Sequence, residues 1–246
     1  MKKILKSLEF CIGIHIIDLI SVIFIGFVCS IFIKDDGDYF CILNTIGNFV
    51  SLIILNSIFS NYNNKVLSKD ILKKVESKKI LYIILFGFGV SVFTSIYVTI
   101  LHTLVPSYTD VSNQLESISS NVIGALAIVV FGPIYEEILY RRIIFEYFKK
   151  NYSLVTAIVF QALVFGVAHG NIVQSIDAFI GGILLALIYI YSNSLLGSII
   201  LHMVFNLIGM WLPEFVNITN TSEYIIILLA IISLIFSIYK MTRKDK

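Results

Sequence analysis

Charged residues are scarce in this sequence. Asp, Glu, Lys and Arg make up 14% of its 246 residues, whereas they make up about 25% of an average soluble domain. Hydrophobic residues account for 58%. This composition argues against an ordinary water-soluble enzyme and against a disordered chain. The formal net charge of +2 is too small to indicate a polyanionic partner, so we expect no nucleic acid to bind.

Cysteine and proline are also rare, with three of each. Cys11, Cys29 and Cys41 form no CxxC motif, and they lack the spacing of metal ligands or of a disulfide framework. We interpret them as small apolar residues of membrane helices. The sequence also lacks internal repeats, low-complexity segments and any polar stretch long enough for a soluble domain.

Long apolar runs are what the chain has in abundance. Because about 20 apolar residues of helix span the roughly 30 Å hydrocarbon core of a bilayer, such runs predict transmembrane helices. We therefore predict an all-α fold, a polytopic membrane helix bundle that forms a single membrane domain over residues 1–246. About eight transmembrane helices are expected, over Phe10–Ile33, Cys41–Ser60, Ile80–Leu104, Asn121–Phe148, Leu154–Ala168, Ile176–Tyr191, Ser194–Trp211 and Tyr224–Tyr239.

Lys and Arg gather in alternate connections. They precede the first predicted helix, follow the eighth, and cluster in loop 61–79 and at the end of the fourth helix, whereas loops 34–38, 105–120 and 213–223 contain only Lys34. The positive-inside rule then places both termini in the cytoplasm. Loop 61–79 is expected to form a short amphipathic helix. Because richness in Ile, Lys and Asn is typical of AT-rich bacterial genes, we expect a multi-pass integral protein of a bacterial plasma membrane.

Ionisable side chains within an apolar span are costly and are therefore functional candidates. Glu136 and Glu137 are adjacent in the fourth predicted helix, shortly after Pro133, which removes one backbone hydrogen bond and can kink the helix. Glu137 and Arg141 are spaced i,i+4 and can pair on one face, whereas Glu136 points about 100° away. A carboxylate outside that pair suits a general acid or base. The competing interpretation is a helix end whose charges face lipid headgroups.

Two further pairs of residues, each with a histidine, lie in apolar helices. His169 follows Phe165 by one turn, and Gly170-Asn171 is expected to end that helix. His202 and Asn206, spaced i,i+4, can both donate hydrogen bonds inward, as stabilisers of an oxyanion do. Each pair is also compatible with a structural role, as a helix cap or as a polar contact between membrane helices.

The three patterns occur in order on separate predicted helices. Glu136-Glu137-x-x-x-Arg141, Phe165-x-x-x-His169 and His202-x-x-x-Asn206 together resemble the CPBP family, the CAAX-protease and bacteriocin-processing (Abi) intramembrane endopeptidases. The resemblance covers residues 120–210, which would form the catalytic core, and leaves the first three predicted helices outside.

The resemblance implies a peptidase that cleaves a membrane-associated peptide or protein tail within or beside the bilayer. Glu136 and His169 would activate a water molecule, and His202 and Asn206 would stabilise the oxyanion of the tetrahedral intermediate. Glu137 and Arg141 would support the site as a buried pair. Peptide maturation, or bacteriocin processing and immunity, is the expected process.

Members of this family have also been described as metalloproteases. Glu136, His169 and His202 would then bind Zn²⁺ and leave an open fourth position. The sequence lacks HExxH, the motif in which two histidines of one helix share a metal. We favour a metal-free, glutamic-type mechanism without a cofactor.

Two other functions fit the same polar residues. A proton-coupled transporter would use the Glu and His side chains as a relay, and it predicts internal repeats, which the sequence lacks. A non-catalytic membrane scaffold would keep the motifs as contacts between helices, and it predicts that Glu136→Gln is silent.

Other residues are predicted to be structural. His15 and Asp18, spaced i,i+3 in the first helix, are expected to pair with one another. Gly166, Gly181 and Gly182 are expected to allow close packing of helices.

Overall fold

The computed structural model describes residues 2–31, 39–60, 66–68, 71–105, 108–215 and 221–243. These residues form helices and no strand, which confirms the predicted all-α fold. The elements in chain order, with η marking π-helical segments, are α1 (Lys2–Ser30), α2 (Tyr39–Ser60), α3 (Ser77–Leu104), α4 (Thr109–Ser119), α5 (Val122–Leu126), η2 (Ala127–Phe131), α6 (Gly132–Glu137), η3 (Ile138–Phe145), α7 (Glu146–Asn151), α8 (Leu154–Ala168), α9 (Ile172–Ser192), α10 (Leu195–Phe215) and α11 (Thr221–Thr242).

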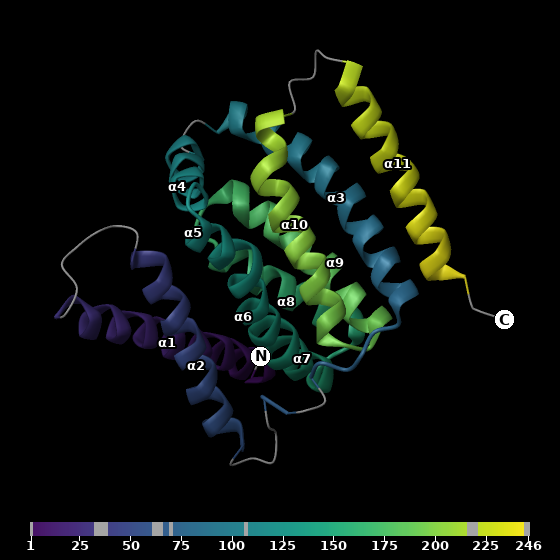
Figure 1. The fold of residues 1–246 in the computed structure, drawn as a ribbon. Coiled ribbons are helices and arrows are strands. Elements are labelled where there is room, and N and C mark those ends of the chain that lie inside the picture. Colours follow the sequence, from purple (N-terminus) through teal and green to yellow (C-terminus); the bar gives the residue numbers. More distant parts are fainter. Residues whose placement is uncertain are drawn as a thin grey trace.

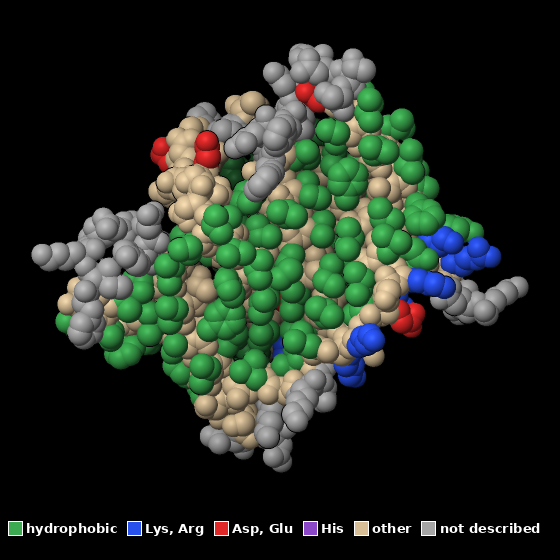
Figure 2. Space-filling view, viewed as in Figure 1, with side chains coloured by type: hydrophobic (Ala, Val, Ile, Leu, Met, Phe, Trp, Pro, Cys, Tyr) green, Lys and Arg blue, Asp and Glu red, His purple; other side chains and the backbone are tan. Residues whose placement is uncertain are grey.

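Large apolar side chains cover much of the surface. Figure 2 shows hydrophobic side chains in a broad band across the molecule, with Lys and Arg gathered at its lower right edge. Exposed apolar surface on this scale needs lipid rather than water around it. Six helical segments are long and apolar enough to cross a membrane, and Leu154–Ala168 and Leu195–Met210 are shorter apolar helices. The chain is therefore an integral membrane protein. The count of eight crossings and the cytoplasmic termini stay predictions.

The helices are arranged around a central group. α1 and α2 pack against one another on one side of the molecule, and α11 packs against α3 on the other (Figure 1). α10 lies between α3 and α9, and α8 and α9 form a hairpin. The continuous helical run from α5 to α7 contacts α8, α9 and α10. Side chains from these four helical segments can therefore meet in the middle of the bundle.

Pro133 is accommodated by a change of helical register. It lies in the first turn of α6, directly after the π-helical segment η2. The N–H of Gly132 donates to the carbonyl of Ala127, five residues earlier. In this register the carbonyl of Ile128 faces residue 133, and proline has no N–H to donate. The Ile128 carbonyl therefore needs a donor from elsewhere.

Two connections differ from their predictions. The amphipathic helix expected in loop 61–79 is absent from residues 66–68 and 71–76, which form turns and irregular chain before α3 begins at Ser77. Instead, the Ser194 hydroxyl donates to the Lys73 carbonyl at 2.6 Å, so the loop is held by contacts at the start of α10. Conversely, connection 105–120 contains the 11-residue helix α4, which the sequence analysis missed.

The predicted local pairing of His15 with Asp18 is wrong. His15 Nδ1 lies 2.8 Å from the Cys11 carbonyl oxygen, which can only accept, so in the neutral ring Nε2 accepts from the Tyr140 hydroxyl at 3.2 Å. Asp18 Oδ1 accepts from the Ser51 hydroxyl at 2.8 Å. Both polar groups therefore find partners on other helices, which links α1 to η3 and to α2.

Candidate active site

The hairpin between α8 and α9 places His169 at the end of a helix. His169 is the C-cap of α8, and Gly170 follows with a φ of 73°, the left-handed conformation that commonly ends a helix. Asn171 is the N-cap of α9, and its Oδ1 accepts from the N–H of Gln174 at 2.9 Å. The predicted helix stop at Gly170-Asn171 is thus confirmed.

Glu137 is the buried centre of an ionic cluster. Its side chain is fully buried, and its Oε1 lies 2.9 Å from Arg141 Nη1 and 2.8 Å from His202 Nδ1. Since a carboxylate only accepts, Nδ1 of His202 carries the proton of that bond. Oε1 alone thus links Arg141 of η3 with His202 of α10. The i,i+4 pairing of Glu137 with Arg141 occurs as the spacing predicts.

Glu136 occupies a different environment from its neighbour. Its side chain is 29% exposed, and its Oε2 lies 3.5 Å from His202 Nε2. His202 is itself buried and stands between the two carboxylates, with one ring nitrogen toward each. Glu136 is therefore the more accessible of the two carboxylates, whereas the buried Glu137 holds the histidine in place.

Phe165 is the packing centre that joins the motifs. Its buried ring contacts His169 edge-on with centroids 4.9 Å apart, and it contacts His202 at 5.9 Å. The Arg141 guanidinium lies 4.8 Å from the same ring, a cation–π distance, and Tyr140 packs edge-on at 4.7 Å. This ring fixes the relative positions of α8, η3 and α10. These contacts explain why a large aromatic residue occupies the first position of the Phe165-x-x-x-His169 pattern.

The tautomer of His169 follows from its helix position. His169 Nδ1 lies 2.9 Å from the carbonyl oxygen of Phe165. Because a carbonyl oxygen accepts only, Nδ1 carries the hydrogen, and in the neutral ring Nε2 carries the lone pair. The helix therefore presents His169 as a base at Nε2.

Asn206 contacts the π-helical segment η2. Its Nδ2 donates to the carbonyl oxygen of Ile128 at 2.8 Å. In the π register this carbonyl would accept from the N–H of residue 133, but residue 133 is proline and has no N–H. An amide NH₂ carries two hydrogens, so this bond fixes the side chain while the second hydrogen can serve another acceptor.

Two contacts near the motifs were missed by the sequence analysis. Gln161 lies one turn before Phe165 and donates from Nε2 to the Gly182 carbonyl at 2.8 Å, which Arg141 Nη2 approaches at 3.4 Å. Gln161 is fully buried, and a buried amide in an apolar helix was the signal that could have identified it. Tyr140, bonded to His15, gave no comparable signal because tyrosines are common in this chain.

The two glycines nearest the site allow close helix contact as predicted. A Cβ on Gly166 would lie 2.6 Å from the Ser175 carbonyl oxygen, and one on Gly182 would lie 3.1 Å from Ala162. The prediction fails for Gly181, because its nearest neighbour would be a Phe205 ring atom at an ordinary 3.9 Å. α8 and α9 therefore approach closely at Gly166 and Gly182.

The start of α4 lies near the same region. Tyr108 is the N-cap of α4, and burial, followed by the negative charge of Asp177 in α9, raises the pKa of its phenol above the ordinary value. Asp177 is also within electrostatic range of His169 and His202. The start of α4 thus lies toward the end of the bundle at which His169 lies.

No group of three or more His, Cys, Asp or Glu residues in the described part of the chain is placed to hold a metal ion. The Zn²⁺ set considered from the sequence, Glu136, His169 and His202, is thus not gathered as a ligand cluster there. His202 instead directs its two nitrogens at two carboxylates.

The chain was compared with protein families, curated proteins and solved structures. Residues 118–208 match the family model described as Rce1-like, type II CAAX prenyl endopeptidase. No curated protein and no solved structure matches the chain. The match confirms the resemblance to the CAAX-protease family that the three motifs indicated. It supports a membrane protease.

Proposed function

We propose that this chain, whose residues 118–208 match the type II CAAX endopeptidases, is a glutamic-type intramembrane endopeptidase. It hydrolyses a peptide bond in a membrane-associated peptide or protein tail. The observation that carries the proposal is the position of His202, whose Nδ1 is 2.8 Å from buried Glu137 and whose Nε2 is 3.5 Å from accessible Glu136. A helix contact that served stability alone would not need a second, partly exposed carboxylate at this point.

Glu136 and His169 activate the attacking water in this proposal. Glu136 is the partly exposed carboxylate of the pair, and His169 presents the lone pair of Nε2 because its Nδ1 is bonded to a backbone carbonyl. The water oxygen attacks the peptide carbonyl carbon while its proton passes to the carboxylate. When the C–N bond breaks, the same proton passes to the leaving amine, so that the general base then acts as a general acid.

His202 and Asn206 stabilise the oxyanion. Glu137 accepts from His202 Nδ1 and orients the ring, and with hydrogen on both ring nitrogens His202 would donate from Nε2 to the negative oxygen of the intermediate. Asn206 is oriented by its bond to Ile128 and supplies its second amide hydrogen. Arg141 balances the charge of Glu137 from the other side. Preorganised donors of this kind act without reorientation during the reaction.

The proposed setting is a bacterial plasma membrane, where the enzyme matures a secreted peptide or takes part in bacteriocin processing or immunity. No metal or other cofactor is part of the proposal. The contacts of His202 with Glu136 and Glu137 suit hydrogen bonding to both carboxylates, and a chelator tests this choice directly.

The test is cleavage by the purified full-length chain in detergent micelles. Internally quenched peptides that carry an acyl or a prenyl anchor would be offered with and without a chelator, and products would be identified by mass spectrometry. Wild-type protein is expected to cleave with or without the chelator. Glu136→Gln and His169→Ala are expected to lose at least about 100-fold in rate, the usual minimum contribution of a general base.

Glu116→Gln is the matched control, because Glu116 is an exposed carboxylate of α4 and the substitution is chemically the same. It should cleave as wild type does. Equal activity of Glu136→Gln and wild type would favour the scaffold interpretation and overturn the site. Loss of activity with chelator and its return with Zn²⁺ would overturn the metal-free mechanism. Proton flux into liposomes without cleavage of any peptide would favour the transporter.

A further inference from the structure

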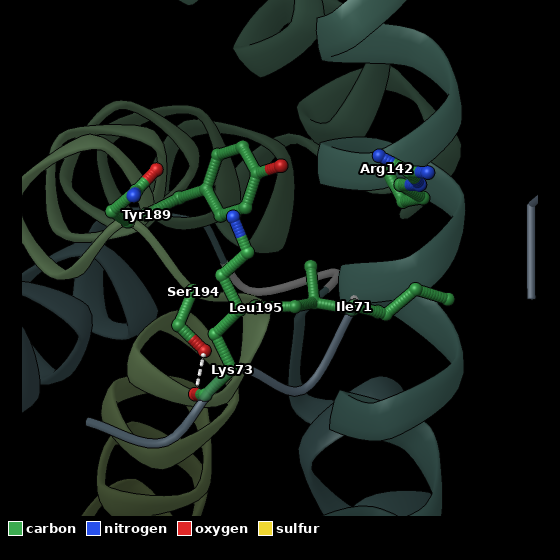
Figure 3. Close-up of a pocket in the computed structure, with 7 residues that line it drawn as sticks. Ile71, Lys73, Arg142, Tyr189, Ser194 and Leu195 are labelled. Carbon is green, nitrogen blue, oxygen red and sulfur yellow. Dashed lines mark hydrogen bonds between the residues drawn. The ribbon is translucent and has the colours of Figure 1, made fainter. Parts of the chain in front are cut away.

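A cavity and a buried amide both lie outside the three motifs. The cavity has a volume of about 180 Å³, and Lys73, Tyr189 and Ser194 help to line it at the turn between α9 and α10 (Figure 3). The Ser194 hydroxyl donates to the Lys73 carbonyl there at 2.6 Å, so the cavity joins the loop before α3 to the start of α10. No motif residue is among its described lining residues. The buried amide is that of Gln161 in α8, and its contacts lead to the proposed active site.

Gln161 lies on the same face of α8 as two motif residues. Gln161, Phe165 and His169 are spaced i, i+4 and i+8, so they form one line along the helix. Gln161 is fully buried, and a buried amide in an apolar membrane helix is costly and therefore a functional candidate. The face of α8 that ends in the proposed base thus also carries Gln161, about two turns earlier.

Gln161 and Arg141 share one acceptor. Gln161 Nε2 donates to the Gly182 carbonyl oxygen at 2.8 Å, and Arg141 Nη2 approaches the same oxygen at 3.4 Å. The two helices are close enough for this contact because Gly182 lacks a Cβ, which would lie 3.1 Å from Ala162. The shorter bond belongs to Gln161, so Arg141 makes only a long bond to α9.

The guanidinium of Arg141 is held by few contacts. Its Nη1 lies 2.9 Å from Glu137 Oε1, it lies 4.8 Å from the Phe165 ring, and its Nε has no hydrogen-bond partner among the described residues. Because a carbonyl oxygen and a carboxylate oxygen both attract this cation, its position depends on how strongly each one does. Glu137 Oε1 also lies 2.8 Å from His202 Nδ1. A displacement of Arg141 therefore reaches a proposed donor to the oxyanion.

The amide of Gln161 acts chiefly as a donor. Its Nε2 donates to two carbonyl oxygens, that of Gly182 and that of Ile158 at 3.0 Å. Its Oε1 is buried, and no described residue donates a hydrogen bond to it. Because a buried amide oxygen without a partner is unfavourable, stability alone would favour an apolar side chain of similar size at this position. The donor atom is thus the useful part of this side chain.

We propose that Gln161 is a positioning residue for the peptidase reaction. By bonding to the Gly182 carbonyl, it leaves Arg141 directed at Glu137. Glu137, balanced in this way, holds His202 where the ring can donate to the oxyanion. Without the Gln161 donor, Arg141 closes on the Gly182 carbonyl and withdraws from Glu137, and His202 loses its fixed position. The role rests on the proposed function, but the position of His202 can be measured without a substrate.

Gln161→Met is the principal variant, because it keeps the length of the side chain and removes the donor. In the full-length chain in detergent, kcat for peptide cleavage should fall about tenfold, within the roughly 100-fold that a misplacement of about 1 Å can cost. KM should stay as in wild type, since Gln161 acts through Arg141 and not on the substrate. Gln161→Leu also lacks the donor and should behave in the same way. Gln114→Met, the same change at an exposed residue of α4, is the matched control and should cleave as wild type does.

A second measurement follows His202 in the absence of peptide. Isotope-labelled histidine gives nuclear magnetic resonance signals from the four histidines of the chain, and loss of one signal in His202→Gln assigns the Nδ1–H of His202. That signal should move in Gln161→Met and stay in place in Gln114→Met. Thermal unfolding, recorded on the same samples, should give midpoints close to wild type for both variants.

Three results would overturn the positioning role. They are wild-type kcat in Gln161→Met, a raised KM with unchanged kcat, and a loss of kcat that accompanies a lower unfolding midpoint while the His202 signal stays in place. A wild-type protein that cleaves no peptide, with a His202 signal that moves in Gln161→Met, would count against the proposed function and support the chain of contacts from Gln161 to His202.

Discussion

Asn206 and Ile128, on helices far apart in the chain, are joined by a hydrogen bond of 2.8 Å from Nδ2 to the backbone carbonyl oxygen. The bond exists because Pro133 cannot donate to that carbonyl in the π register of η2. Asn206 therefore supplies the hydrogen bond that Pro133, in another helix, cannot donate. This bond allows an irregular backbone inside the membrane, where unpaired carbonyls are costly.

This relationship predicts that Asn206 and Pro133 are energetically coupled. Asn206→Leu should lower the free energy of unfolding by about 1–3 kcal/mol, because it leaves the Ile128 carbonyl without a donor. In a Pro133→Ala background, residue 133 regains an N–H, so the added loss from Asn206→Leu should be smaller. Thermal unfolding of the four proteins in one detergent gives the coupling as a double-mutant cycle. Strictly additive effects would contradict the proposed link.

The two adjacent glutamates should respond differently to loss of charge. Glu137→Gln leaves Arg141 buried without its counter-charge, and breaking a buried ion pair in this way costs about 3–5 kcal/mol. Glu136→Gln alters a partly exposed side chain and should leave the unfolding midpoint within a few degrees of wild type while removing activity. Thermal unfolding measured alongside cleavage separates the two effects. Similar midpoints for both variants would argue against the division of roles.

Close packing of α8 on α9 should make Gly166 intolerant of a methyl group. Gly166→Ala would force a Cβ to 2.6 Å from the Ser175 carbonyl oxygen, a backbone atom that cannot rotate away. We expect a loss of about 1–3 kcal/mol in stability, the usual cost of overpacking. Gly181→Ala is the control, because its Cβ would find only an ordinary contact at 3.9 Å. Chemical unfolding by a denaturing detergent compares the two, and equal stability of both variants would contradict the predicted close approach.

Tyr140 should connect α1 to the site through its hydroxyl. Tyr140→Phe keeps the ring against Phe165 and removes the bond to His15 Nε2, so we expect a loss of about 1 kcal/mol. Tyr224→Phe, a change at an exposed tyrosine of α11, should cost nothing measurable. Because both changes remove the same His15–Tyr140 bond, combining Tyr140→Phe with His15→Leu should cost less than the sum of the two single losses in thermal unfolding. Strictly additive losses would contradict this bond.

The parts of the site that depend on local spacing could be predicted from the sequence. The Glu137–Arg141 pair follows from i,i+4 geometry, and the end of α8 follows from Gly170-Asn171. The pairing of His15 with Asp18 was wrong, although their spacing allowed it, because partners on neighbouring helices were available. Helix α4 was missed because it is polar and short, and the apolar pattern used to find membrane helices does not detect it.

The sequence by itself determined that this is a bundle of apolar helices with three polar motifs. Because lipid offers no hydrogen-bond partners, the backbone N–H and C=O groups of a long apolar run must bond to one another, and an α-helix achieves this within one segment. Tertiary structure alone decided that His202 stands between two carboxylates, that Phe165 contacts both histidines, and that Asn206 reaches the carbonyl left open by Pro133. These contacts join separate helices, and their geometry depends on how those helices pack rather than on any local spacing.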